Sequence, residues 1–186
     1  MRLGRADEAI AEARRAVEVD PMASGARSNL GSMYAYARRA EESVRAYEEA
    51  LALFPESPVL LANLAATYSD LGRHSEALDA AGQARTLAPE DGFSLAVYGY
   101  VAAGAGRPEE AEEVLRELEK APGASPYVKA VVHAALGRRD QAFALLEQAV
   151  EERDEYAADL GVDPAFDRLR DDPRMGRLLQ KAGLPH

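Results

Sequence analysis

The sequence predicts an all-α protein: a right-handed solenoid of antiparallel helix pairs followed by a C-terminal capping segment. Two observations lead to this fold class. Ala, Leu, Glu and Arg, which are good helix formers, dominate the composition, and β-branched residues rarely cluster. In addition, proline and glycine recur at a fixed interval. Pro21, Pro55 and Pro89 are 34 residues apart, as are Gly72 and Gly106. A fixed period of this length is typical of stacked repeats.

Each repeat is expected to form two antiparallel helices. The predicted units are a half repeat at 1–21 with one helix at 5–18, then repeats at 22–55 (helices 24–36 and 40–53), 56–89 (58–70 and 74–87), 90–122 (92–104 and 108–120) and 123–152 (125–135 and 139–152). Within these helices apolar residues recur three or four positions apart, as Val44, Tyr47 and Leu51 do. This spacing places them on one helical face.

Proline and glycine mark the ends of the expected helices. Pro55 ends a pair because proline cannot continue a helix. Gly72 suits the left-handed conformation that closes a helix, and Pro108 suits the first turn of the next one. From Gly106 to Gly137 the interval shortens to 31 residues, which predicts a small change in superhelical angle at this joint and no domain boundary.

Small residues recur where the two helices of a pair must approach closely. Gly31 and Gly99 occupy this position in two of the first helices, and Tyr34 and Tyr47 fill the adjacent space in repeat 22–55. An alternation of small and large side chains allows tight packing of a helix pair.

These motifs resemble the tetratricopeptide repeat. The matching residues are Leu30-Gly31-x-x-Tyr34 with Ala50 and Pro55, and Leu64-Ala65-x-x-Tyr68 with Gly72, Ala77, Ala84 and Pro89. The resemblance covers residues 1–152, or about four and a half repeats, and departs from the family pattern at Arg27, Leu61, Ser43 and Lys129. It implies a superhelix whose concave side is lined by the first helix of each pair, and a function in holding another protein chain.

Residues 153–186 are not a repeat and resemble the C-terminal cap of many bacterial tetratricopeptide proteins. Such caps often follow a DNA-binding, nucleotide cyclase or protein kinase domain. A solenoid needs a cap to cover its last apolar surface. Asp163 and Asp172, each followed by proline, are expected to cap short helices. The residues expected to cover helix 139–152 are Phe166, Leu169, Met175, Leu178 and Leu179.

At the other end, helix 5–18 has no partner helix before it. Ile10, Ala13 and Val17 are therefore expected to have one uncovered flank. Two compatible explanations stay open: the chain is a piece of a longer protein, or this end forms a homodimer.

Composition excludes several classes of function. A net charge of −10 argues against direct nucleic-acid binding and against an anionic membrane surface. The chain has no cysteine, no apolar segment of a signal peptide and no run long enough to span a membrane, so a cytoplasmic location is expected.

No catalytic residue, metal site or cofactor is predicted. The three histidines have no metal-binding spacing, and Glu109 and Glu110 fit the first turn of a helix, where negative charge is favourable. No nucleophile or phosphate-binding motif is present. The basic residues between Arg168 and Lys181 are interpreted as a solvated face neutralised by neighbouring aspartates, with contact to phosphate or an acidic partner as the alternative. Those aspartates are Asp163, Asp167, Asp171 and Asp172.

The concave groove is the candidate binding site. The residues predicted to contact a bound peptide are Ser28, Asn29, Ser32, Tyr36, Ala62, Asn63, Ala66, Asp70, Phe93 and Tyr100. Asn29 and Asn63 are 34 residues apart and would stack in a row, from which their amides either grip a peptide backbone or only meet solvent. The half of the groove that begins at Phe93 is apolar and suits a hydrophobic peptide or an amphipathic helix.

The predicted function is therefore that of a non-enzymatic scaffold that binds a peptide segment or helix of a partner protein. The alternative is a regulatory or oligomerisation segment of a larger signalling protein, such as a transcription regulator, cyclase or kinase.

Overall fold

The structure is a computed structural model that describes residues 3–121 and 123–185, and this part of the chain is helical without strands. The helix pairs are α2 (Ser24–Tyr36) with α3 (Ala40–Leu53), α4 (Pro58–Asp70) with α5 (His74–Leu87), α6 (Gly92–Gly104) with α7 (Pro108–Lys120), and α8 (Pro126–Ala135) with α9 (Arg139–Glu152). They are preceded by α1 (Leu3–Val19) and followed by the 3-10 helices η1 (Glu155–Asp159) and η2 (Pro164–Leu169) and by α10 (Pro173–Lys181). The predicted fold class is confirmed.

Seven of the expected helices begin and end at the predicted residues, namely α2 to α7 and α9. The α8 helix begins one residue later than expected because Ser125 is its cap, and the Ser125 hydroxyl accepts hydrogen bonds from the amides of Tyr127 (3.0 Å) and Val128 (3.4 Å). The α1 helix extends beyond the predicted range of 5–18 at both ends.

The turn within each helix pair requires a left-handed residue. Gly72, Gly106 and Gly137 take φ angles of +73°, +76° and +74°. Arg38 stands at the corresponding position of the first full repeat and takes a φ of 61°, a conformation that is unfavourable for a residue with a side chain. The Arg38 side chain forms an ion pair with Asp167 in η2, so this strained turn is tied to the end of the chain.

The close approach predicted at the small residues is present. A methyl group added at Gly31 would overlap the ring of Tyr47, and one added at Gly99 would lie 3.0 Å from both Val114 and Val132. Gly31 therefore lets α2 and α3 approach closely, and Gly99 lets α6 approach both α7 and α8.

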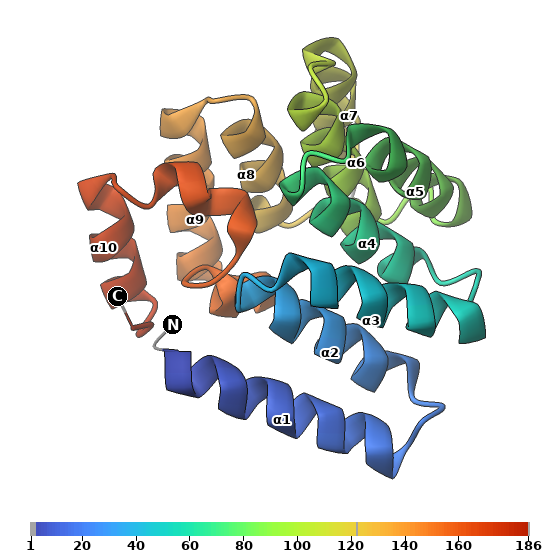
Figure 1. The fold of residues 1–186 in the computed structure, drawn as a ribbon. Coiled ribbons are helices and arrows are strands. Elements are labelled where there is room, and N and C mark those ends of the chain that lie inside the picture. The colour runs from blue at the N-terminus through green and yellow to red at the C-terminus, as the bar shows by residue number, and fades with distance from the viewer. Residues whose placement is uncertain (1–2, 122, 186) are drawn as a thin grey trace.

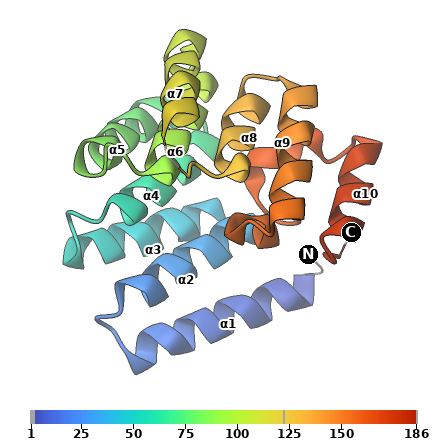
Figure 2. The same ribbon diagram turned by 180° about the vertical axis from the view of Figure 1, so that it is seen from behind.

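The helix pairs stack into a curved array whose two ends approach each other (Figures 1 and 2). Neighbouring first helices contact along the inner side, α4 with α6 and α6 with α8. After α9 the chain turns back toward α2 instead of continuing away from the array. The C-terminal residues therefore lie against the first full repeat as well as the last one.

The C-terminal residues form one apolar cluster with α8 and α9. As predicted, Phe166, Leu169, Met175, Leu178 and Leu179 pack with Phe143, Leu146 and Ala149 of α9. The carboxylates of Asp163 and Asp172 cap η2 and α10 by accepting hydrogen bonds from the amides of Ala165 and Arg174. Leu160 and Tyr127 join the same cluster, so it extends toward the concave side.

The prediction of an uncovered flank at α1 is wrong for Ile10 and Ala13. Each of these side chains is only 3% exposed, because α1 packs against α2 with this face inward. Val17 is half-buried. Ile10 and Ala13 are therefore not available for self-association in this conformation.

Within residues 3–121 and 123–185, none of the helices combines the length and the apolar character needed to cross a membrane.

Candidate functional site

The C-terminal part of the chain crosses the concave face. Residues 154–170, which contain η1 and η2, are called the return segment here. The Tyr36 hydroxyl donates a hydrogen bond of 3.0 Å to Asp159 Oδ2, and the Tyr127 hydroxyl donates one of 2.8 Å to Asp163 Oδ2. The return segment is thus bound at one end of the array through α2 and at the other through α8.

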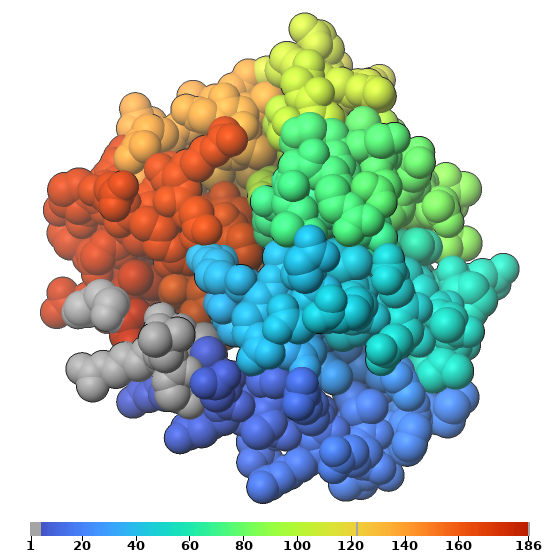
Figure 3. All heavy atoms as spheres, viewed as in Figure 1, coloured from blue at the N-terminus to red at the C-terminus, as the bar shows by residue number. Residues whose placement is uncertain are grey.

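Aromatic rings reinforce these contacts. The rings of Phe93 and Tyr156 stack with centroids 5.8 Å apart and an interplanar angle of 9°. Tyr127 meets Phe166 edge to face at 5.2 Å. Figure 3 shows the orange and red C-terminal residues against the light-blue residues of the first full repeat.

The return segment is a permanent wall of the site. Its residues Leu160, Phe166 and Leu169 are at most 1% exposed. Full burial of such a side chain stabilises by about 1.5–3 kcal/mol, so the three together contribute roughly 5–9 kcal/mol. The segment is therefore firmly attached to α8, α9 and α10, with which these side chains form one apolar cluster.

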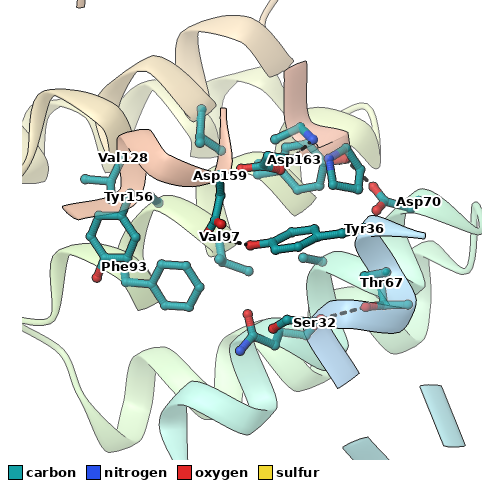
Figure 4. A pocket seen from close by; sticks show the side chains of 18 of the residues that line it. Ser32, Tyr36, Thr67, Asp70, Phe93, Val97, Val128, Tyr156, Asp159 and Asp163 are labelled. Atoms are coloured by element: carbon teal, nitrogen blue, oxygen red, sulfur yellow. Dashed lines mark hydrogen bonds between the residues drawn. The ribbon is translucent and has the colours of Figure 1, made fainter. Parts of the chain in front are cut away.

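A cavity of about 110 Å³ remains between the return segment and the inner faces of α2, α4, α6 and α8. Figure 4 shows the Tyr36 hydroxyl directed at Asp159, with Phe93 and Tyr156 on one side of them and Asp70 on the other. Six of the lining residues are aromatic: Tyr36, Tyr47, Phe93, Tyr100, Tyr127 and Tyr156. Aromatic rings therefore form a substantial part of the wall of the cavity.

The charges of the cavity are all negative. Its 20 lining residues include Asp70, Asp159 and Asp163 but no lysine, arginine or histidine. Each carboxylate accepts a hydrogen bond from a tyrosine hydroxyl. The donor is Tyr100 for Asp70, Tyr36 for Asp159 and Tyr127 for Asp163. Within the described part of the chain, none of the three forms an ion pair.

This environment raises the pKa of the ionisable groups that line the cavity. Partial removal from water raises the pKa of Asp163 and of Asp159 above the ordinary value, and it raises the pKa of Asp70, a residue that is exposed overall, to about 6. Burial and the nearby carboxylates also raise the pKa of Tyr36 and Tyr100. The two tyrosines therefore stay hydrogen-bond donors over the whole physiological range.

Sequence models of the tetratricopeptide repeat match residues 22–90, 63–126 and 127–148. The chain belongs to the tetratricopeptide repeat family. Together the three matches span α2 to α9, in agreement with the resemblance noted in the sequence.

Solved structures show the same fold. A thermophilic tetratricopeptide repeat protein of Thermus thermophilus has a TM-score of 0.67 at 21% identity, over 96% of this chain and 92% of that one. A tetratricopeptide repeat protein of Parabacteroides merdae has a TM-score of 0.53 at 20% identity, over 97% and 73%. YrrB, a protein of the same family, has a TM-score of 0.50 at 19% identity, over 91% and 90%. No curated protein sequence matches this chain.

The tetratricopeptide groove gathers most of the residues proposed from the sequence. Seven of the ten line the cavity: Ser32, Tyr36, Asn63, Ala66, Asp70, Phe93 and Tyr100. Ser28 lies next to them and accepts a hydrogen bond of 3.3 Å from the Asn63 amide. Ala62 is 0% exposed, so its assignment to a peptide-binding surface is wrong. It belongs to the apolar cluster formed by α3, α4, α5 and α6 instead.

The proposed asparagine row is divided between two environments. Asn63 is half-buried, and its side-chain amide is already bonded to Ser28. Asn29 is exposed and lies outside the lining of the cavity. The two amides therefore do not present equivalent donors to a ligand in this conformation.

Of the three carboxylates that form the acidic wall of the cavity, the sequence predicted Asp70 as a groove residue but not Asp159 or Asp163. Asp163 was predicted to neutralise the basic residues of the cap, but its carboxylate accepts from Tyr127. Arg170 donates to the carbonyl oxygens of Leu160, Gly161 and Asp163 and so holds the return segment in shape. Elsewhere the basic residues pair with acidic side chains as expected, for example Arg174 with Asp172. The repeat period carries no signal for these contacts, because it ends before the return segment.

The three carboxylates do not form a metal site. Within residues 3–121 and 123–185, no group of three acidic, histidine or cysteine side chains is arranged to hold a metal ion.

Proposed function

We propose that this tetratricopeptide repeat protein is a non-enzymatic interaction module that holds a segment of a partner protein at its concave face. The observation that carries this proposal is the cavity. Seven of the ten residues expected to bind a peptide line it, together with residues of the return segment. Proteins of this repeat family are typically scaffolds without catalytic activity, which supports the same assignment.

The return segment limits how a partner can bind. Because it fills the middle of the groove, an extended peptide or a whole helix has no continuous concave surface to lie on. Pockets for drug-sized ligands are about 300–1,000 Å³, and a dry cavity of about 150 Å³ accepts benzene. A cavity of about 110 Å³ is smaller than either and suits one inserted side chain. The partner segment would then rest on the rim.

The structural relatives are compatible with peptide recognition. YrrB is described as a tetratricopeptide repeat protein with an unusual peptide-binding site. Its likeness to this chain concerns the fold, so it supports a peptide ligand in general and does not identify one.

The first test is capture of partners from a lysate of the source organism with Asn63→Ala and Tyr100→Ala. Both residues line the cavity. We expect at least one partner bound by the wild type to be lost from both variants, while their thermal unfolding shows that they remain folded. Partners that bind both variants with unchanged affinity would contradict the assignment to the groove.

The second candidate function is a regulatory or oligomerisation segment of a larger signalling protein. Apolar side chains exposed where α1 ends favour it, since Val19 is 86% exposed and Met22 is 63% exposed. A concentration series by light scattering tests self-association, and Val19→Ser with Met22→Ser should abolish it. A mass that stays monomeric at all concentrations argues against oligomerisation through this surface.

A further inference from the structure

We propose that the concave cavity recognises a cation, namely the ammonium or guanidinium group of a lysine or arginine side chain from the partner. This inference rests on the proposed function and specifies the chemistry of the group that enters the site.

The cavity contains uncompensated negative charge. Buried or half-buried charges in proteins are normally paired, because removal from water is costly. Asp159 and Asp163, which are half-buried, and Asp70, which is exposed at one end, line one small space without any lysine, arginine or histidine in that lining. A bound anion would meet repulsion from all three, and a neutral apolar group would leave their charge unbalanced. A cation is the ligand that offsets it.

Two carboxylate oxygens have unused capacity to accept hydrogen bonds. Asp159 accepts from Tyr36 through Oδ2 only, and Asp70 accepts from Tyr100 through Oδ1 only. Within the described residues, Asp159 Oδ1 and Asp70 Oδ2 accept no hydrogen bond. Asp159 Oδ1 is not sealed from solvent, and Asp70 is an exposed residue. An ammonium group has three donors and a guanidinium five, and neither has an acceptor. Such a group complements these free oxygens.

The walls of the cavity suit the rest of such a side chain. Aromatic rings attract cations to their faces, and they also pack against an alkyl stem. Elsewhere in the described structure, five arginine–ring contacts occur, and the rings involved belong to Tyr34, Tyr68, Tyr98 and Phe143. None of these four residues lines the cavity. The rings of the cavity are therefore not already occupied by a cation of the chain in this way.

One approach to the cavity is also acidic. A neighbouring hollow of about 180 Å³ shares Phe93, Val128 and Tyr156 with it, and the charged residues that line this hollow are Glu90, Asp91 and Glu155. We call this hollow the acidic mouth. The hollow at the opposite end is mixed in charge, since it contains Arg38 and Arg168 as well as Asp167. Only the acidic mouth is lined by negative charge alone. A positively charged segment would therefore be guided into the cavity through the acidic mouth.

The raised pKa of the carboxylates agrees with a site built for a positive ligand. Desolvation is the largest cause at Asp70, Asp159 and Asp163. A cation that enters the cavity favours the ionised carboxylates and so should lower their pKa.

The direct test uses n-butylammonium, which reproduces the end of a lysine side chain, in a titration of the full chain followed by NMR. Ethylguanidinium is the arginine probe, and n-butanol and butyrate are the neutral and anionic controls. We expect both cations to shift the resonances of Phe93, Tyr36 and Ala66, and to bind at least tenfold more tightly than n-butanol. Equal affinity for butylammonium and butanol would overturn the inference.

Variants then assign the charge. Asp159→Asn keeps the shape of the side chain and removes its charge. It should weaken the binding of butylammonium by at least about tenfold. Asp70→Asn should act in the same direction, whereas Asp171→Asn is a control on an exposed residue outside the cavity lining. An unchanged affinity in both cavity variants would overturn the inference, provided that their unfolding curves match the wild type.

The same variants separate this inference from the proposed function. If Asp159→Asn still captures partners that Tyr100→Ala loses, the cavity binds a partner but does not recognise a cation. If Tyr100→Ala also retains every partner, the proposed function itself is wrong.

Discussion

Tyr36 and Asp159 are 123 residues apart in the chain and are joined by a hydrogen bond of 3.0 Å between the tyrosine hydroxyl and the carboxylate. Tyr36 ends the first helix of the first full repeat, and Asp159 ends η1 after the last repeat. The bond therefore connects the two ends of the solenoid. It converts an open groove into a cavity with a rigid wall.

The Tyr36–Asp159 bond should contribute measurably to stability. A hydrogen bond to a charged group is worth about 1.5–3 kcal/mol, so a cycle of Tyr36→Phe, Asp159→Ala and the double variant should give a coupling energy of about 1 kcal/mol or more. Urea unfolding of the four proteins measures it. Strict additivity of the two single changes would show that the closed arrangement is not maintained in solution.

Gly31 should be intolerant of any side chain. A methyl group there overlaps the ring of the buried Tyr47, so Gly31→Ala should lower the free energy of unfolding by about 1–3 kcal/mol. Gly25 lies in the same helix with open space around it. As the matched control, Gly25→Ala should leave stability unchanged or raise it by up to about 1 kcal/mol. Equal effects of the two changes in denaturant unfolding would contradict the packing described for α2 and α3.

Arg38 combines a strained backbone with a contact to the return segment. Arg38→Gly removes about 1 kcal/mol of left-handed strain but also loses the exposed ion pair with Asp167, which is worth about 0–1 kcal/mol. The two effects should nearly cancel in the wild type. In an Asp167→Asn background, where the pair is already absent, Arg38→Gly should stabilise by about 1 kcal/mol. Thermal unfolding compares the four proteins, and a loss of stability in that background would refute the strain at Arg38.

The carboxylates of the cavity should make stability depend on pH. Their pKa values are raised in the folded state, so the folded protein binds more protons than the unfolded chain. Their contribution to the free energy of unfolding is present at low pH. It is lost as the pH rises through the pKa values of the folded state, and the pKa of Asp70 is about 6. Asp70 is influenced by Tyr100, Asp163 and Asp167, and by the opposing positive charge of Arg38. The free energy of unfolding should therefore fall between about pH 4 and pH 7.

The control for this dependence is replacement of the titrating groups. Asp70→Asn and Asp159→Asn should each flatten the slope between about pH 4 and pH 7. Asp172, whose pKa is lowered by hydrogen bonds from Arg174, acts in the opposite sense, because its contribution is lost as the pH falls through its folded value. A wild-type profile that rises over the same interval would contradict the assignment at the cavity.

The repeats were predictable because their signals are local. Pro55, Gly72 and Gly106 fix where helices end, and the spacing of Val44, Tyr47 and Leu51 fixes which face is buried. Phe166 and Leu169 could likewise be assigned to the cap, since a solenoid needs its last apolar surface covered. These inferences need only neighbours in the chain or in the next repeat.

The part of the acidic wall formed by Asp159 and Asp163 could not be predicted in this way. Whether Asp159 reaches Tyr36 depends on the curvature summed over all the repeats, which no single motif encodes. The same limit explains Asp163, whose neighbours in sequence suggested a surface ion pair while its neighbour in space is Tyr127. Ala62 shows a smaller error of this kind, because a rotation of part of a helical turn separates a groove position from a buried one.

The central claim, that the concave cavity receives the partner, is tested most directly by filling it. Ala66 is half-buried and lines the cavity, whereas Ala144 is exposed on α9 and does not line it. The measurement is the dissociation constant of a captured partner for Ala66→Trp and for the matched control Ala144→Trp, with unfolding curves confirming that both fold. We predict that Ala66→Trp weakens binding at least tenfold and that Ala144→Trp leaves it unchanged. Equal affinity of both variants and the wild type would contradict the account.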